Sequence, residues 1–206
     1  ERVDFEAMVA ERRPDGVIVL TPDDTHDAYI GRALRLGCEC VTEKPLTTTP
    51  DGCRSILDAC RETGRHCRVA FNYRYAPWNT EIKRLLSAGV IGRVHTVTLR
   101  RTLPFARGPS YFHRWHGESA RSGGLLIHKG THYLDLANFF LADVPQIVYA
   151  HGSQQIYTDA FARSLGLTRR GDRCGDCPHA DVCPFFRGRD DQPEAESVVR
   201  ARGQAG

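Results

Sequence analysis

Short apolar runs alternate with segments of helical spacing over the first third of the sequence, and this alternation constrains the fold more than any other feature of the chain. The apolar runs are Gly16–Leu20, Cys38–Thr42 and Cys67–Phe71, each of strand length. Helical spacing fills the two intervals, from Thr25 to Leu36 and from Thr49 to Gly64. Strands that alternate with helices at this spacing predict a parallel sheet with covering helices.

Local signals support the boundaries of these helices. Gly37 stands where the first helix should end, and glycine is typical of the position after a helix C-terminus. Thr49 and Pro50 give the second helix an N-cap followed by a proline at its first position. A further helix is expected over Asp4–Arg13, before the first strand.

After Phe71 the pattern changes to that of a second, α+β unit. Four elements are expected there: a helix over Pro77–Ser87 closed by Gly89, a strand over Arg93–Thr102, a helix over Leu125–Leu141 and a strand from Gln146 to about Tyr157. The predicted fold class is therefore α/β. A partial Rossmann parallel sheet over residues 1–72 is followed by an incomplete α+β domain with an open sheet over residues 73–186. The polar residues 187–206 are expected to form a flexible tail.

Charge and hydropathy limit the partners. The 206 residues include 28 basic and 25 acidic side chains that are interspersed, so the net charge of +3 is too mild to indicate nucleic-acid binding. The sequence has neither an apolar run long enough to span a membrane nor a signal peptide in its first residues. We therefore expect a cytoplasmic protein whose partner is a small molecule.

Polar loops follow all three predicted strands. They are residues 21–26 (TPDDTH), 43–45 (EKP) and 72–75 (NYRY). Ligands bind outside the carboxyl ends of the strands in an open parallel sheet, so these loops should line one crevice. Lys44 could there hydrogen-bond a reacting hydroxyl and favour its deprotonated form. For any single loop, the alternative is a solvated turn.

The helix expected over Leu125–Leu141 contains two histidines. His128 and His132 are four residues apart and Asp135 follows three later, so one helix face should carry both imidazoles and the carboxylate. Histidine titrates near neutrality and suits the role of a general base that removes a hydroxyl proton. The pair could also bind a metal, although HKGTH lacks the glutamate of a zinc-protease helix, or could simply be satisfied at a domain interface.

Several segments together resemble the Gfo/Idh/MocA family of NAD(P)-dependent sugar oxidoreductases. They are VIVLTPDDTH, GCECVTEKPLTTT, VAFNYRYAPWNTEIK, IGRV and SGGLLIHKGTHYLDLANFF, in an order that covers about residues 14 to 150. The resemblance implies a Rossmann domain that binds NAD or NADP. It also implies a second domain with an open sheet that carries the substrate site and an oligomer interface, so that the intact protein would form a homo-oligomer.

The resemblance also assigns individual residues. The positions expected at the cofactor are Thr21, Pro22, His26, Glu43, Lys44, Pro45 and Asn72. Lys44 would also reach the substrate hydroxyl, and His132 matches the catalytic histidine of the family. Arg74 and Lys129 are expected on the substrate side. The Lys44-Pro45 bond is the expected place for a cis peptide.

The sequence departs from the family in two places. Many members have an aspartate where this chain has His128, which would then stand in for that carboxylate; this HKxTH pattern resembles a branch of the family. In that branch Arg114 and Trp115 would lie in a substrate-side loop, with ordinary interface packing as the alternative. The second departure is that only 15 residues precede Gly16, without a G-x-G-x-x-G motif. We therefore expect a fragment that binds NAD(P) weakly or not at all.

The predicted activity is hydride transfer between NAD(P) and a secondary alcohol of a sugar, cyclitol or related polyol, impaired in this chain. His132 would take the hydroxyl proton, with Lys44 positioning the oxygen and His128 assisting. Two alternatives remain: an NAD-assisted eliminase or glycosidase of the same family, and a non-catalytic binding protein.

A cysteine cluster lies near the end of the second domain. Cys174, Cys177 and Cys183 fall within residues 173–184, with His179 between the last two. This spacing could hold a structural zinc ion or, less readily, an iron–sulfur cluster. The alternatives are reduced thiols, a single disulfide or a redox role.

Overall fold

The computed structural model describes residues 4–103, 111–112, 114–169, 171 and 173–186, so the tail expected over 187–206 lies outside the described residues. The chain divides into two compact units. One comprises residues up to 101 together with residues 114–146, and the other comprises residues 102–113 and those from 147 onward. In the described part of the chain, no helix is long and apolar enough to cross a membrane.

The first unit contains the predicted parallel sheet. Its strands are β1 (Gly16–Val19), β2 (Glu39–Thr42) and β3 (Cys67–Val69), paired in the order β1-β2-β3. Both pairings are parallel. The α/β prediction is therefore confirmed, with strands slightly shorter than the apolar runs that predicted them.

Helices precede and connect these strands. Three are α-helices, namely α1 (Phe5–Arg12), α2 (His26–Arg35) and α3 (Pro50–Thr63), and a 3-10 turn, η1 (Asp23–Thr25), leads into α2. The Thr49 side chain caps α3 by accepting a hydrogen bond from the backbone N–H of Gly52, as the Thr-Pro pair predicts. Gly64 ends α3 with a φ of 68°, a left-handed conformation that favours glycine.

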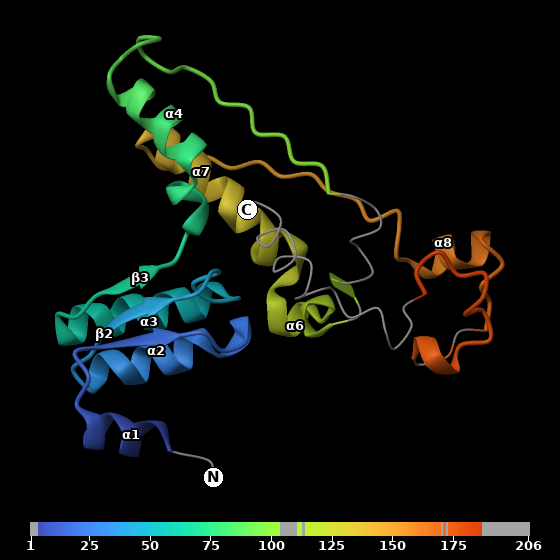
Figure 1. Ribbon diagram of the computed structural model, residues 1–206, viewed down its shortest axis with the longest axis horizontal. Coiled ribbons are helices and arrows are strands. Elements are labelled where there is room, and N and C mark those ends of the chain that lie inside the picture. The colour runs from blue at the N-terminus through green and yellow to red at the C-terminus, as the bar shows by residue number, and fades with distance from the viewer. Residues whose placement is uncertain (1–3, 104–110, 113, 170, 172, 187–206) are drawn as a thin grey trace, which may run out of the picture. The chain divides into compact units, whose positions relative to one another are not determined.

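A single core joins α1, α2, α3 and one face of the sheet. Ile30, Leu34 and Ile56 are its largest apolar side chains and are almost completely buried. Burial of each should stabilise the fold by about 1.5 to 3 kcal/mol. Figure 1 shows α2 and α3 side by side along the sheet. Val19 is buried whereas its neighbour Ile18 is 68% exposed, so the described helices cover one face of the sheet.

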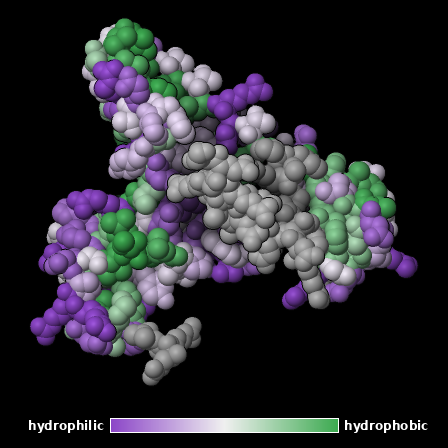
Figure 2. Space-filling view, viewed as in Figure 1, coloured by the Kyte–Doolittle hydropathy of each residue, from purple (hydrophilic) through white to green (hydrophobic). Residues whose placement is uncertain are grey.

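The remaining helices of the first unit follow β3. They are η2 (Asn72–Tyr75), α4 (Pro77–Ser87), η4 (Trp115–Gly117), α6 (Ser119–Ser122), the π-helical turn η5 (Leu126–Gly130) and α7 (Thr131–Leu141). The turn after α4 is apolar at its surface, where Val90 and Ile91 are both exposed (Figure 2).

The helix predicted over Leu125–Leu141 forms, but its first turn is a π-helix.

The prediction of strands over Arg93–Thr102 and Gln146–Tyr157 is wrong for the described residues, which run there as coil without strand pairing. Alternation of side chains favours an extended backbone, but a strand also needs a neighbour that accepts and donates its backbone hydrogen bonds. In the second unit the described helices are α8 (Asp159–Ser164) and the 3-10 turn η6 (Cys174–Asp176).

Candidate active site

The loops that follow β1 and β2 are joined by a buried histidine. The ring nitrogens of His26, at the start of α2, lie 2.8 Å from the carbonyl oxygen of Pro45 and 2.9 Å from that of Thr21. The side chain is completely buried, so these contacts replace its hydration. The Lys44-Pro45 peptide bond is cis, as expected. Two of the loops predicted to share a crevice are therefore held together at the carboxyl end of the sheet.

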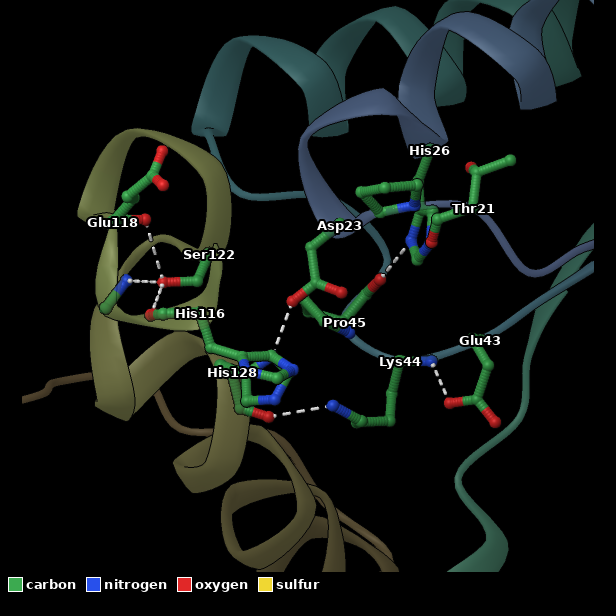
Figure 3. A network of polar contacts seen from close by, with 12 residues as sticks. Thr21, Asp23, His26, Glu43, Lys44, Pro45, His116, Glu118, Ser122 and His128 are labelled. Carbon is green, nitrogen blue, oxygen red and sulfur yellow. Dashed lines mark hydrogen bonds and ion pairs between the residues drawn. The ribbon is translucent and has the colours of Figure 1, made fainter. Parts of the chain in front are cut away.

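Lys44 extends from the second loop to the helix that carries the histidines. Its Nζ donates a hydrogen bond to the carbonyl oxygen of His128 at 2.9 Å (Figure 3). Burial lowers the pKa of Lys44, and the positive charge of Lys129 adds to this effect, whereas Asp23 and Glu43 oppose it. The ammonium group is thus partly desolvated and has both positively and negatively charged side chains near it, as expected for a group that binds a polar oxygen.

The ring of His128 contacts the first loop. Its Nδ1 lies 2.6 Å from Oδ2 of Asp23, the first residue of η1, and both side chains are 7% exposed. The loops after β1 and β2 therefore meet at the same residue, one at its ring and the other at its backbone carbonyl (Figure 3). Asp23 was absent from the predicted site, because its partner lies 105 residues away and no local pattern marks the pair.

His132 lies in a separate aromatic environment. Its ring stacks on that of Tyr73 at a centroid distance of 4.0 Å and an interplanar angle of 10°, and it meets Phe71 edge-on at 6.3 Å. Burial lowers the pKa of His132 to about 4, assisted by the positive charges of Lys44 and Lys129. The imidazole is therefore neutral at neutral pH and can accept a proton.

One ring nitrogen of His132 has no partner within the part of the chain that the structure describes. Its Nδ1 is buried and neither accepts nor donates a hydrogen bond within those residues. A buried polar atom without a partner is costly and rare, and a catalytic role is one explanation for it. The sequence could not show that Nδ1 of His132 lacks a partner, although the HKGTH pattern did single out the residue.

His132 and Asp135 lie three residues apart in α7, as expected, whereas His128 lies in the preceding π-helical turn η5. The four-residue spacing that aligns side chains in an α-helix therefore does not apply between His128 and His132. Asp135 instead binds Arg74, whose Nε donates to Oδ2 at 2.7 Å. The guanidinium of Arg74, expected at the substrate, is thus engaged by a buried carboxylate.

Other predicted residues lie around this centre with fewer contacts. Trp115 meets the ring of His128 edge-on at 5.8 Å, and the guanidinium of Arg121 lies 5.5 Å from the Trp115 ring, which fits the packing alternative. Three further predicted residues, Asn72, Arg114 and Lys129, are exposed.

The cysteine cluster lies in the second unit. Cys174, Cys177, His179 and Cys183 line one cavity of about 650 Å³, together with aromatic side chains such as Phe161. Among the described residues, however, no group of three or more histidine, cysteine or acidic side chains is arranged to hold a metal ion. A zinc site needs four donors that converge within about 2.3 Å of one point. The structural zinc is therefore not supported by this arrangement.

Two family models match the chain. The model described as the NAD-binding Rossmann fold of an oxidoreductase family (GFO_IDH_MocA) matches residues 2–71, and the C-terminal alpha/beta domain of the same family matches residues 83–177.

Individual proteins give the same result. YteT of Bacillus subtilis (strain 168), a protein named as an oxidoreductase, is 37% identical to this chain over 182 residues. These residues make up 88% of this chain and 42% of YteT. D-glucoside 3-dehydrogenase of Escherichia coli (strain K12) is 30% identical over 79% of this chain and 46% of its own length. The crystal structure of WlbA dehydrogenase from Bordetella pertussis, in complex with NADH and UDP-GlcNAcA, is 25% identical with a TM-score of 0.57 and covers 67% of this chain and 40% of that one. The chain spans less than half the length of these relatives.

Proposed function

Since the chain belongs to the Gfo/Idh/MocA oxidoreductase family, we propose that its site serves the oxidation or reduction of a secondary alcohol on a sugar, cyclitol or related polyol. One observation carries this proposal: the loops after β1 and β2 meet the histidine-bearing helix at one place, through Asp23 and Lys44. The relative named D-glucoside 3-dehydrogenase and the WlbA dehydrogenase in complex with NADH and UDP-GlcNAcA support the substrate class.

The residues at the carboxyl end of the sheet fit the nicotinamide side of an NAD or NADP cofactor. Ligands of open parallel sheets bind at this end, where Thr21, Glu43 and Pro45 stand in two loops that His26 holds together. When bound, the cofactor supplies the carbon that accepts or donates a hydride. These loop residues would bind it, while Lys44 faces the alcohol from the same side.

His132 and Lys44 have complementary roles in this proposal. A neutral imidazole accepts the hydroxyl proton, and the low pKa that burial gives His132 keeps its ring neutral at neutral pH. Lys44 donates a hydrogen bond to the alcohol oxygen, and its positive charge favours the deprotonated form. The positive charge of Lys44 is one of those that lower the pKa of His132, which supports assigning the two side chains to one site.

Turnover separates these roles from a structural one. The assay follows net formation of NADH or NADPH with methyl glucosides and cyclitols as substrates. His132→Ala should lower turnover by at least about 100-fold, the usual contribution of a general base, without a comparable loss of cofactor affinity. His66→Ala is the matched control, since His66 is exposed. Equal turnover in His132→Ala and wild type would remove His132 from the mechanism.

Two measurements address the alternatives. Calorimetric titration with NADH and NADPH tests cofactor binding, and we expect this chain to bind weakly, because no glycine-rich phosphate loop occurs in its sequence. Micromolar binding would contradict that expectation. Product release without net NADH would indicate an eliminase or glycosidase instead of a dehydrogenase.

A further inference from the structure

Asp23 and His128 form a buried pair that links distant parts of the chain. They are 105 residues apart, and the Oδ2-to-Nδ1 distance of 2.6 Å is that of a strong, charge-assisted hydrogen bond. Asp23 begins η1 after β1, whereas His128 lies in the π-helical turn that precedes α7. The contact joins the loop at the sheet to the helix of the proposed alcohol site.

The chemistry of this pair determines which ring nitrogen carries a proton. An ionised carboxylate can only accept hydrogen bonds, so Nδ1 of His128 must be the donor. In the neutral ring the proton is then fixed on Nδ1, and Nε2 becomes the basic atom. A buried aspartate has the same effect on histidine in hydrolase triads, where it fixes the tautomer and stabilises the imidazolium.

We propose that Asp23 is a positioning residue that holds His128 in the Nδ1–H tautomer and thereby makes Nε2 the atom that exchanges a proton. The proposal rests on the proposed function for the use made of that proton, but not for the tautomer itself. A carboxylate would thus act through His128 in this chain.

Neighbouring side chains restrict rotation of the His128 ring. Trp115 meets it edge-on at 5.8 Å and His116 lies at a centroid distance of 4.7 Å. The backbone of His128 is itself held by Lys44. A ring fixed at its backbone, at one nitrogen and by two aromatic neighbours has little freedom to exchange its two nitrogens, which distinguishes this contact from a surface ion pair.

Nitrogen NMR of the ¹⁵N-histidine-labelled chain tests the tautomer at neutral pH. In the wild type we expect a protonated Nδ1 in His128, hydrogen-bonded and protected from exchange. Asp23→Ala should produce a mixture of tautomers, and Asp24→Asn, which changes the adjacent carboxylate, should leave the spectrum as in the wild type. An unprotonated Nδ1 in the wild type overturns the proposal, even if Asp23→Ala fails to fold. An unchanged tautomer in folded Asp23→Ala also overturns it.

Kinetics provide a second, separate measurement. Asp23→Asn keeps the size of the side chain but can donate to Nδ1 and so favour the wrong tautomer, and we expect at least a 10-fold loss of kcat with little change in KM. Asp23→Glu should restore part of the kcat. Equal kcat in Asp23→Asn and wild type contradicts the proposal. Absence of turnover in the wild type at concentrations of NADH or NADPH that saturate the chain would instead refute the proposed function, and the NMR result would still decide the role of Asp23.

Discussion

The buried imidazole of His132 should make the folded chain lose stability as the pH falls below about 6.5. Burial and two nearby lysines lower its pKa to about 4, whereas the pKa of a histidine in the unfolded chain is about 6.5. Between these values the unfolded chain binds a proton that the folded chain does not. Acid therefore favours unfolding, and the stability present above the unfolded pKa is lost as the pH approaches the folded pKa.

The two pKa values set the magnitude. A separation of about 2.5 pH units corresponds to a loss of about 2 kcal/mol at pH 5 and about 3 kcal/mol at pH 4, relative to neutral pH. Below about pH 4 the folded state also binds the proton, and this contribution stops growing. Other groups titrate in the same range, so the effect must be measured as a difference between two proteins.

Urea unfolding of wild type and His132→Gln across this pH range isolates the contribution. The variant loses the stack on Tyr73, which affects all pH values equally, and its free energy of unfolding should fall less steeply than that of the wild type. His66→Gln, a change at an exposed ring, is the matched control. A constant difference between wild type and His132→Gln from pH 7 to pH 4, or an ordinary pKa in an NMR titration of the ring, would refute the reasoning.

Three further predictions concern stability. Ile30→Ala opens a cavity in the core and should reduce the free energy of unfolding by about 2 to 5 kcal/mol, whereas Leu57→Ala at a half-exposed position should cost far less; urea titration measures both. Gly52→Ala places a methyl group against a buried threonine, so it should lower the melting temperature although alanine favours helices, and a raised melting temperature would contradict the close contact. Arg74→Met leaves the Asp135 carboxylate buried without its partner and should cost about 3 kcal/mol in urea unfolding; recovery in the double variant with Asp135→Asn would confirm the cause.

Much of the first unit could be predicted because its signals are local. Apolar runs of strand length, a Thr-Pro helix start and a glycine after a helix each depend on a few neighbouring residues. The loops after β1 and β2 were correctly expected to meet, since the carboxyl ends of adjacent parallel strands lie at the same edge of a sheet. In those loops, residue type was enough to select Lys44, whereas His26 was expected from the resemblance to the family.

Contacts between distant residues were beyond such reasoning. The partner of Asp23 is a histidine 105 residues later, and the partner of Arg74 is a carboxylate 61 residues later. The π-helical turn was also missed, because apolar spacing does not distinguish one wide turn within a helix. Strands over 93–102 and 146–157 were predicted from alternation alone, which contains no information about a pairing partner.

The two hydrogen-bonded contacts of His128, with Asp23 and with Lys44, differ in how far they depend on the amino acid at position 128. The contact with Asp23 requires an imidazole, whereas Lys44 binds a backbone carbonyl that every amino acid possesses. Sequence change at position 128 could therefore exchange one acid–base group for another without displacing the lysine. A site built in this way can diversify its chemistry over evolution one side chain at a time, while its scaffold is inherited unchanged.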